Sequence, residues 1–561
     1  MLNKTKVLGF IESLAYPIAV WNILILFFEP VVSHYFYLEQ AQYWTAVVNL
    51  LFIIITLAFR GILSRFAETR YRTVADLLIL IFGSLLFLYD VKFVIFFLLI
   101  RQIFFIAKYF FFNAFEGAVY KRLVKNPPVT FLLSFATTIL FGTALLMLPS
   151  ATVGNKVTPF INALFTSTSA TCVTGLVVVD TGTYFSTFGQ LIILALIQIG
   201  GLGIMTISTA FAVLLGQKLT LKVENVMQNV MGQSMKFDMV TLVKNVVLLT
   251  LIIEAIGAVF LFTTFSRLYE TPRAIYYSVF HSISAFCNAG FSLYSDSFVR
   301  FVFNPNINLA VTLLIVLGGL GFPVIVDLYN HLTRKSNRYT LALHTKIVLS
   351  MTAFLLIFGV VAFIVSEYYN TMKDFTIQQK LMTSWFQSVT CRTAGFNTLD
   401  QGQMRHSSSL LSMILMFIGA SPGSTGGGVK TSTFALLLLS IIALIKGQSD
   451  LTIFKRKIGS ASARQSVGLI MLSMISIFLI AFLILLNDRF DLEQILFEAI
   501  SAFGTVGLSL GITPQLNSLS KLLIIVLMYI GRVGPLTVLF ALSQRKKTLH
   551  YELAEEKITI G

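Results

Sequence analysis

The sequence predicts an all-α membrane protein, and three observations carry that prediction. Of its 561 residues, 56% are hydrophobic and only 12% are charged, whereas an average soluble domain has about 25% charged residues. Twelve apolar stretches reach the roughly 20 residues with which a helix crosses a bilayer. A glycine pattern recurs four times between residues 130 and 543. The composition excludes a soluble domain and a disordered chain, and three cysteines are too few for a disulfide scaffold.

Hydropathy places the membrane spans, and lysine and arginine orient them. The predicted spans are 7–28, 43–59, 74–89, 92–112, 130–149, 188–213, 240–263, 306–329, 344–366, 408–444, 465–486 and 519–543. In the connecting segments, 26 lysines and arginines fall on one side and 8 on the other. Because cytoplasmic loops carry the excess of positive charge, we expect both termini in the cytoplasm. This distribution explains the net charge of +16 without nucleic-acid binding.

Four shorter apolar stretches of about 10–14 residues each end in a loop of small residues and lie between two full spans. They read TSTSATCVTGL (166–176), HSISAFCNAGFS (281–292), WFQSVTCRTAGFNT (385–398) and FEAISAFGTVGLS (497–509). A second glycine motif follows each one: IGGLG (199–203), LGGLG (317–321), IGASPG (418–423) and IGRVG (530–534). Two motifs in register four times predict a pseudo-fourfold array of helix–pore-loop–helix repeats, preceded by about four extra transmembrane helices.

The repeats set the expected domain boundaries. These are an N-terminal four-helix transmembrane block at 1–126, pore repeats at 127–237, 238–341, 342–463 and 464–547, and a cytoplasmic tail at 548–561. In the N-terminal block, the fourth span carries Lys92, Arg101 and Lys108. Voltage sensors are rich in regularly spaced arginine, whereas gaps of 9 and 7 residues separate these three cations. A sensor-like scaffold or a packing domain is therefore expected here.

Irregular backbone inside a membrane must be buried in protein or line a water-filled cavity. Four loops that meet on one axis can form rings of carbonyl oxygens, which replace the water shell of a monovalent cation. Glycine reaches the unusual backbone angles without a Cβ clash, and the short helices direct their negative ends at the ion. Close helix packing by small residues would explain one such loop, but not four. The predicted ion-binding residues are Thr171, Cys172, Val173, Thr174, Gly175, Cys287, Asn288, Ala289, Gly290, Arg392, Thr393, Ala394, Gly395, Gly504, Thr505, Val506 and Gly507.

The apolar stretch 408–444 is too long for one crossing, and Pro422 and several glycines interrupt it. We expect this loop to lie just cytoplasmic to the filter and to obstruct the pore. It is not a phosphate-binding loop, because Val429 separates the last glycine from Lys430 and no strand precedes it. Arg532 is an intramembrane charge, which is usually functional. The predicted gate residues are Gly423, Ser424, Thr425, Gly426, Gly427, Gly428, Lys430 and Arg532.

Several other polar residues have two interpretations each. Lys430 either pairs within the helix bundle or extends toward the cytoplasm, and Arg392 is expected to brace the third loop, with Glu498 as a candidate acceptor. The loop cysteines Cys172, Cys287 and Cys391 could together form a metal site, but we expect them to be small packing residues. The outer carboxylates Asp180, Asp296 and Asp400 either raise the local cation concentration or are simply solvated.

The motifs resemble those of the Trk, Ktr and HKT superfamily of K⁺ transporters over residues 127–545. The resemblance rests on TCVTGLVVVDTGTYFS (171–186), CNAGFS (287–292), CRTAGFNT (391–398), SPGSTGGGVKTST (421–433) and GTVGLS (504–509). It implies K⁺ uptake through a filter with one glycine per repeat, and an arginine that faces the gate loop. It also implies a homodimer in the lipid of the bacterial plasma membrane, a cytosolic ring of RCK-type nucleotide-binding subunits, and no cofactor on this chain.

Two other function classes fit the sequence less well. A Na⁺- or H⁺-coupled secondary transporter with alternating access usually shows inverted repeats, whereas these repeats all have one orientation. A membrane enzyme is not expected, because the sequence shows no cluster of metal ligands and no nucleophile with its base.

Overall fold

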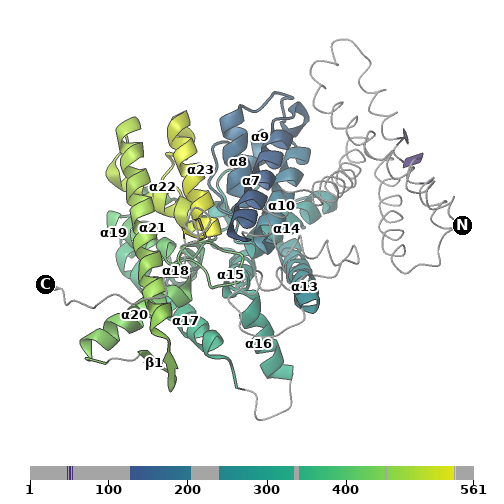
Figure 1. Ribbon diagram of the computed structural model, residues 1–561. Coiled ribbons are helices and arrows are strands. Elements are labelled where there is room, and N and C mark those ends of the chain that lie inside the picture. Colours follow the sequence, from purple (N-terminus) through teal and green to yellow (C-terminus); the bar gives the residue numbers. More distant parts are fainter. Residues whose placement is uncertain are drawn as a thin grey trace, which may run out of the picture.

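The computed structural model describes residues 127–203, 239–333, 340–448, 451–535 and 537–538, with a few residues between 47 and 54. Apart from those few residues, the predicted N-terminal block and the predicted tail at 548–561 lie outside the described residues. The described chain is mostly helical, as predicted. Its helices are α7 (Pro127–Leu146), α8 (Phe160–Thr171), α9 (Thr181–Tyr184), α10 (Thr187–Leu202), α13 (Met239–Phe265), α14 (Thr271–Phe286), α15 (Pro305–Leu320), α16 (Phe322–Thr333), α17 (Leu343–Glu367), α18 (Ile377–Thr390), α19 (His406–Phe417), α20 (Thr431–Ile445), α21 (Ser460–Asn487), α22 (Leu492–Gly504) and α23 (Ser518–Val533) (Figure 1).

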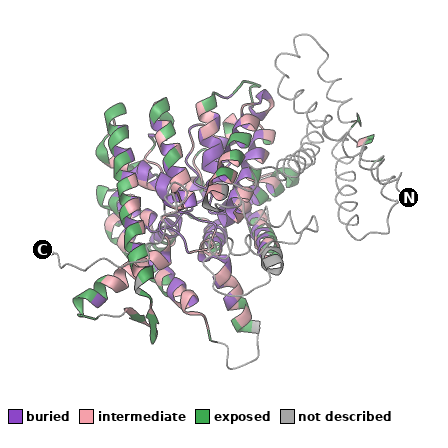
Figure 2. Cartoon of the chain, in the orientation of Figure 1, coloured by how far each residue is buried: buried purple, intermediate pink, exposed green. Residues whose placement is uncertain are grey.

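Long apolar helices form the outer part of the described structure. Three of them, at Asn245–Phe265, Leu343–Glu367 and Ala461–Asn487, are long and apolar enough to cross a membrane. Their outward faces carry large apolar side chains, such as Ile357 (64% exposed) and Phe478 (59% exposed). Figure 2 shows α21 largely in the green of exposed residues. Apolar side chains that face outward from such helices suit a lipid environment. A small antiparallel hairpin, β1 (Leu451–Ile453) with β2 (Arg456–Ile458), joins α20 to α21.

The predicted span at 306–329 is not one continuous helix. Helices α15 and α16 occupy this stretch and meet at an angle of 98°. Gly321 lies between them with a φ of +92°, a conformation that glycine adopts without steric cost. The N–H of the next residue, Phe322, donates to the Gly423 carbonyl at 3.0 Å. The bend therefore follows from a backbone angle and a tertiary contact, and hydropathy detects neither.

Two further predicted spans contain a helix end. Helix α10, in the predicted span 188–213, ends at Leu202, and α23, in the predicted span 519–543, ends at Val533. Most of the rest of each span lies outside the described residues. Each helix is capped by the last glycine of its motif, Gly203 or Gly534, with φ of +81° and +90°. The long stretch 408–444 consists of two helices, α19 and α20, separated by the irregular backbone of residues 418–430.

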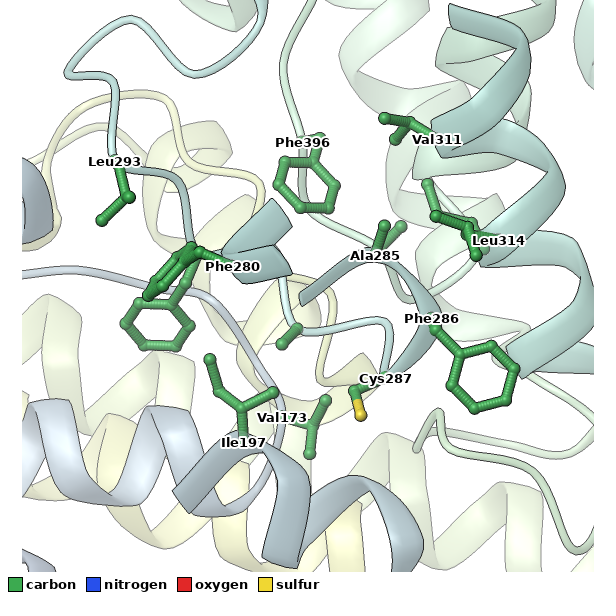
Figure 3. Packing of buried hydrophobic residues seen from close by; sticks show 14 of the residues in the cluster. Val173, Ile197, Phe280, Ala285, Phe286, Cys287, Leu293, Val311, Leu314 and Phe396 are labelled. Atoms are coloured by element: carbon green, nitrogen blue, oxygen red, sulfur yellow. The ribbon is translucent and has the colours of Figure 1, made fainter. Parts of the chain in front are cut away.

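The four short helices α8, α14, α18 and α22 are held inside this outer layer. A buried serine in each of three of them donates to a carbonyl of the preceding long helix: Ser167 to Ile139 at 2.7 Å, Ser282 to Glu254 at 2.6 Å, and Ser388 to Leu356 at 2.8 Å. A hydrophobic cluster around α14 joins α10, α15 and Phe396 of the segment after α18 (Figure 3). These contacts fix the C-terminal ends of the short helices and so the loops that follow.

Candidate functional site

The loops after α8, α14, α18 and α22, named the first to fourth loops, share one backbone path. They contain Gly175, Gly290, Gly395 and Gly507, whose φ angles are +89°, +69°, +77° and +94°. Two residues before each glycine, a non-glycine residue also has a positive φ: Val173 (+58°), Asn288 (+60°), Thr393 (+69°) and Thr505 (+49°). Positive φ at a non-glycine residue is uncommon, and rarer still at β-branched ones. Four such residues in register therefore indicate a common and constrained geometry.

The four glycines contact one another in a closed order. A Cβ atom on Gly175 would overlap the Ala289 carbonyl oxygen and lie 3.1 Å from Gly290 Cα. The corresponding distance to the next Cα is 3.1 Å from Gly290 to Gly395 and 3.2 Å from Gly395 to Gly507. It is 2.9 Å from Gly507 back to Gly175. Each glycine thus packs against the backbone of the following loop, and the fourth closes on the first. No side chain fits at these four positions.

Hydroxyl groups of the short helices fix the loops at the ring. Ser169 Oγ accepts from the Gly175 N–H at 3.1 Å, and Ser501 Oγ accepts from the Gly507 N–H at 3.1 Å. In the second and third loops, Ser284 and Thr390 instead donate to the carbonyl oxygens of Phe291 and Phe396, both at 2.8 Å. Each loop is therefore tied to the helix that precedes it.

The side chains beside the ring glycines are fully buried in hydrophobic clusters. Val173 and Cys287 belong to one cluster, and Figure 3 labels both next to Ile197 of α10. Cys172 and Cys391 belong to two others. All three thiols are free and buried, and the described residues contain no group of side chains suited to a metal ion. Among the described residues, no set of metal ligands surrounds these cysteines, and each lies in a hydrophobic cluster.

The second glycine motif lets the next helix approach the ring closely. A Cβ atom on Gly200 would overlap the Thr171 carbonyl oxygen at the end of α8. In the same way, a Cβ atom on Gly318 would overlap the Phe286 carbonyl oxygen at the end of α14. A Cβ atom on Gly531 would overlap the Phe503 carbonyl oxygen near the end of α22. In the third motif, a Cβ atom on Gly419 would instead overlap the carbonyl oxygen of Gly427 in the 418–430 loop. Backbone-to-backbone contact of this kind is what small residues permit in membrane helices.

The 418–430 loop lies against the segments that lead into the ring. Thr425 donates its N–H to the Gly318 carbonyl at 3.2 Å and its hydroxyl to the Phe286 carbonyl at 3.2 Å. The Gly427 N–H donates to Thr505 Oγ1 at 3.0 Å, and a Cβ on Gly426 would overlap Thr393 Oγ1. The loop therefore contacts the second, third and fourth loops or the helix ends before them.

The two predicted gate cations both bind this loop. Arg532 of α23 donates from Nη1 to the Thr425 carbonyl and from Nη2 to the Gly200 carbonyl of α10. Lys430 Nζ donates to the Gly426 carbonyl at 2.6 Å, so the lysine pairs within the bundle. Another loop hydroxyl, Ser424 Oγ, donates to the Ser421 carbonyl at 2.6 Å. Arg532 thus connects the loop to a helix of another part of the chain.

The predicted acceptor of Arg392 needs correction. Arg392 is buried, and its Nη2 lies 3.5 Å from the Gly419 carbonyl, so it contacts the start of the 418–430 loop. The prediction that Glu498 accepts a hydrogen bond from Arg392 is wrong. Glu498 accepts from Ser509 Oγ and, at 2.8 Å, from Thr513 Oγ1 of the segment after the fourth loop. Sequence alone could not reveal these partners, because they depend on the path of the chain after the glycine.

The three outer carboxylates have local roles. Asp180 accepts from the Thr183 N–H at 2.7 Å and so caps α9, and Asp400 accepts from the Gly402 N–H at 3.1 Å. Asp296 pairs with Arg300 at 2.7 Å, and this hydrogen-bonded partner raises the pKa of Arg300 above its ordinary value.

The structure also brings together a buried polar group that the sequence interpretation missed. Glu254 of α13 is 5% exposed, and its Oε2 accepts from Gln198 Nε2 of α10 at 3.2 Å. Cys287 Sγ lies 3.7 Å from Gln198 Oε1 and 3.8 Å from Glu254 Oε1. The sequence does contain a signal for this group, because Glu254 is the one carboxylate in the predominantly apolar helix α13, and carboxylates inside membrane spans are usually functional.

Known proteins share this sequence pattern and this fold. The sequence model of the TrkH family, described as cation transport proteins, matches residues 105–550. The Ktr system potassium uptake protein B of Bacillus subtilis is 41% identical over 436 residues, which cover 77% of this chain and 96% of that protein. The potassium/sodium uptake protein NtpJ of Enterococcus hirae is 38% identical over 451 residues, which cover 79% and 98%. The crystal structure of the potassium transporter TrkH from Vibrio parahaemolyticus is 17% identical and matches with a TM-score of 0.59 over 91% of this chain and 99% of that chain, so the two share a fold.

Proposed function

We propose, because this chain belongs to the TrkH family of cation transport proteins, that it takes up potassium through a pore whose selectivity filter is the ring of four loops. The closed order of contacts among Gly175, Gly290, Gly395 and Gly507 is the observation that carries this proposal. Four loops that meet in this way are related by pseudo-fourfold symmetry about one axis. The multi-pass apolar helices around them provide the membrane-spanning frame.

The composition of the ring supports potassium as the transported ion. The four glycines have no side chains, and the side chains of neighbouring residues such as Val173, Ala289 and Val506 are buried in hydrophobic clusters. The polar atoms that these residues can offer to an ion are therefore their backbone carbonyl groups. Carbonyl oxygens replace the hydration shell of K⁺ in this way in potassium channels. The C-terminal ends of four short helices add a favourable potential for a cation.

The 418–430 loop, with Lys430 and Arg532, is proposed as the gate. Its contacts with Phe286, Thr393 and Thr505 support a position directly beside the inner end of the filter. The two cations add an electrostatic barrier to a permeating cation. Opening would require the loop to release its hydrogen bonds to Arg532 and to the helix ends.

The assembly around the pore is a proposal as well. The relative in Bacillus subtilis is named as part of a Ktr system, which supports a complex with further subunits. We assign to this chain a homodimer in the bacterial plasma membrane, with cytoplasmic termini and an RCK-type nucleotide-binding ring on the cytoplasmic side. The four extra N-terminal helices precede the pore repeats in this arrangement. The charge distribution of the connecting segments supports the orientation.

A cation-coupled carrier is the second candidate function. The name of the relative from Enterococcus hirae includes both potassium and sodium, which favours a role for Na⁺ either as a second permeant ion or as a coupling ion. A carrier saturates at low K⁺ and needs the coupling gradient, whereas a pore conducts along the electrochemical gradient alone.

Uptake of ⁸⁶Rb⁺ and ²²Na⁺ into proteoliposomes with the purified chain tests the proposal. With an inside-negative potential and no Na⁺ or H⁺ gradient, we expect ⁸⁶Rb⁺ uptake that external K⁺ blocks and Na⁺ blocks weakly. Uptake that appears only when a Na⁺ or H⁺ gradient is imposed would favour the carrier. Equal uptake of both isotopes would contradict a potassium filter.

A further inference from the structure

Behind two of the four loops, a buried side chain nine residues before the ring glycine contacts a serine two residues after it. In the second loop, His281 is fully buried and its Nε2 lies 3.2 Å from Ser292 Oγ. In the fourth loop, Glu498 is 1% exposed and accepts a hydrogen bond from Ser509 Oγ. The two pairs therefore occupy equivalent positions relative to Gly290 and Gly507.

Both buried side chains act as acceptors, although their chemistry differs. His281 Nδ1 lies 2.7 Å from the Tyr277 carbonyl oxygen, which can only accept, so Nδ1 carries the proton. The free lone pair of Nε2 then accepts from the Ser292 hydroxyl and from the Leu293 N–H at 3.3 Å. The carboxylate of Glu498 accepts from two hydroxyls, as described above. The hydrogen-bond donors to His281 Nε2 and to the Glu498 carboxylate therefore all come from the segment that follows the ring glycine of the same loop.

The two serines extend the connection by one more step. Ser292 Oγ accepts from the Tyr294 N–H at 3.0 Å, and Ser509 Oγ accepts from the Gly511 N–H at 2.8 Å. Each pair therefore links the short helix, through the serine, to the backbone four residues beyond the ring glycine. We name these two sets of contacts the braces of the second and fourth loops.

The first and third loops have other residues at these positions. Thr166 stands nine residues before Gly175, but its hydroxyl donates to Asn162 of its own helix at 2.9 Å, and Val177 takes the place of the serine. In the third loop the equivalent residues are Phe386 and Asn397. The contact order of the ring glycines makes the second and fourth loops opposite each other. The two braced loops therefore lie on opposite sides of the ring, and the two unbraced loops lie between them.

We infer that His281, Ser292, Glu498 and Ser509 are positioning residues that hold two opposite loops at a fixed separation and thereby set the preference for K⁺ over Na⁺. The inference rests on the proposed function. A carbonyl filter selects through its size or through the number and field strength of its oxygens. Outward movement of two opposite loops changes all of these properties, although none of the four side chains needs to contact the ion.

The double substitution Ser292→Ala and Ser509→Ala tests the inference, because it removes both hydroxyls and adds no volume. We expect the ratio of ⁸⁶Rb⁺ to ²²Na⁺ uptake in proteoliposomes to fall about two- to tenfold for each brace, the factor that one hydrogen bond represents. Most of the fall should come from increased ²²Na⁺ uptake. The matched Ser292→Thr and Ser509→Thr variants keep the hydroxyl at half-buried positions and should retain the wild-type ratio.

The Thr166→Val variant is the control for the same position in an unbraced loop, and its ratio should stay at the wild-type value. An unchanged ratio in the double alanine variant, or an equal fall in Thr166→Val, would overturn the inference. If the double variant fails to fold, the single variant Ser509→Ala is measured instead, and an unchanged ratio of ⁸⁶Rb⁺ to ²²Na⁺ uptake would again overturn the inference. Loss of selectivity already in the wild type would instead contradict the proposed function, so the two failures are distinguishable.

Discussion

Arg532 donates a hydrogen bond to the backbone carbonyl of Thr425, 107 residues earlier in the chain. Its second guanidinium nitrogen binds the Gly200 carbonyl of α10. One side chain therefore ties the 418–430 loop to helices from the two ends of the pore region. In the proposed function this tether keeps the gate closed, and its positive charge repels a cation that approaches the filter.

Substitution of the tethering arginine is predicted to open the gate. The Arg532→Ala variant loses both charge-assisted hydrogen bonds and the local charge, so basal ⁸⁶Rb⁺ uptake should rise about tenfold or more. Arg532→Lys keeps a charge but cannot donate in two directions from a planar group, and it should give an intermediate rate. The exposed Arg489 provides a matched control, since Arg489→Ala should behave as the wild type. A lower basal rate in a well-folded Arg532→Ala variant would remove the gate hypothesis.

The 418–430 loop itself is predicted to limit flux. Deletion of residues 423–428 removes its contacts with Phe286, Thr505 and Arg532, and uptake measured without any regulatory subunit should increase. The near-isosteric Thr425→Val removes only the hydroxyl that donates to Phe286 at 3.2 Å, so we expect a smaller rise of about two- to fivefold. Thr137→Val, which changes an exposed hydroxyl on α7, should leave the rate unchanged. Uptake that decreases in both loop variants would show that the loop supports conduction.

The buried carboxylate of α13 is predicted to stabilise the packing of α10 against α13. Glu254→Leu leaves the Gln198 amide without its acceptor at 3.2 Å, and we expect a loss of about 1 kcal/mol in unfolding free energy. The thermal unfolding midpoint in detergent micelles should fall accordingly. Glu254→Gln keeps an acceptor oxygen and should lie near the wild type. A midpoint for Glu254→Leu at or above the wild-type value would contradict a stabilising role.

The sequence was most informative where a local rule fixes the backbone. The glycine of each loop, the proline and glycines of the 418–430 loop, and the alternation of short and long apolar stretches all follow from helix length and from the properties of glycine and proline. The bend at Gly321 escaped this reasoning, because hydropathy counts apolar residues and does not register a φ of +92°. The predicted span therefore continued through it.

Long-range partners could not be predicted in the same way. Glu498 lies where an intramembrane carboxylate would be expected to meet a cation, yet it binds the hydroxyls of Ser509 and Thr513. The order in which the four loops contact one another also depends on the packing of all the outer helices. Spacing along the chain indicates that four loops are equivalent, but it contains no information on which loop lies beside which.

The ratio of ⁸⁶Rb⁺ to ²²Na⁺ uptake by Gly175→Ser tests the central claim most directly. A Cβ at this position overlaps the Ala289 carbonyl oxygen of the next loop, so the ring must distort, and we predict that the ratio falls at least about fivefold as Na⁺ is admitted. The control is Gly447→Ser, at a glycine with a φ of +63° and no neighbour within 4 Å of a Cβ, and its ratio should match the wild type. A wild-type ratio in folded, conducting Gly175→Ser would contradict the claim that these four glycines form the filter.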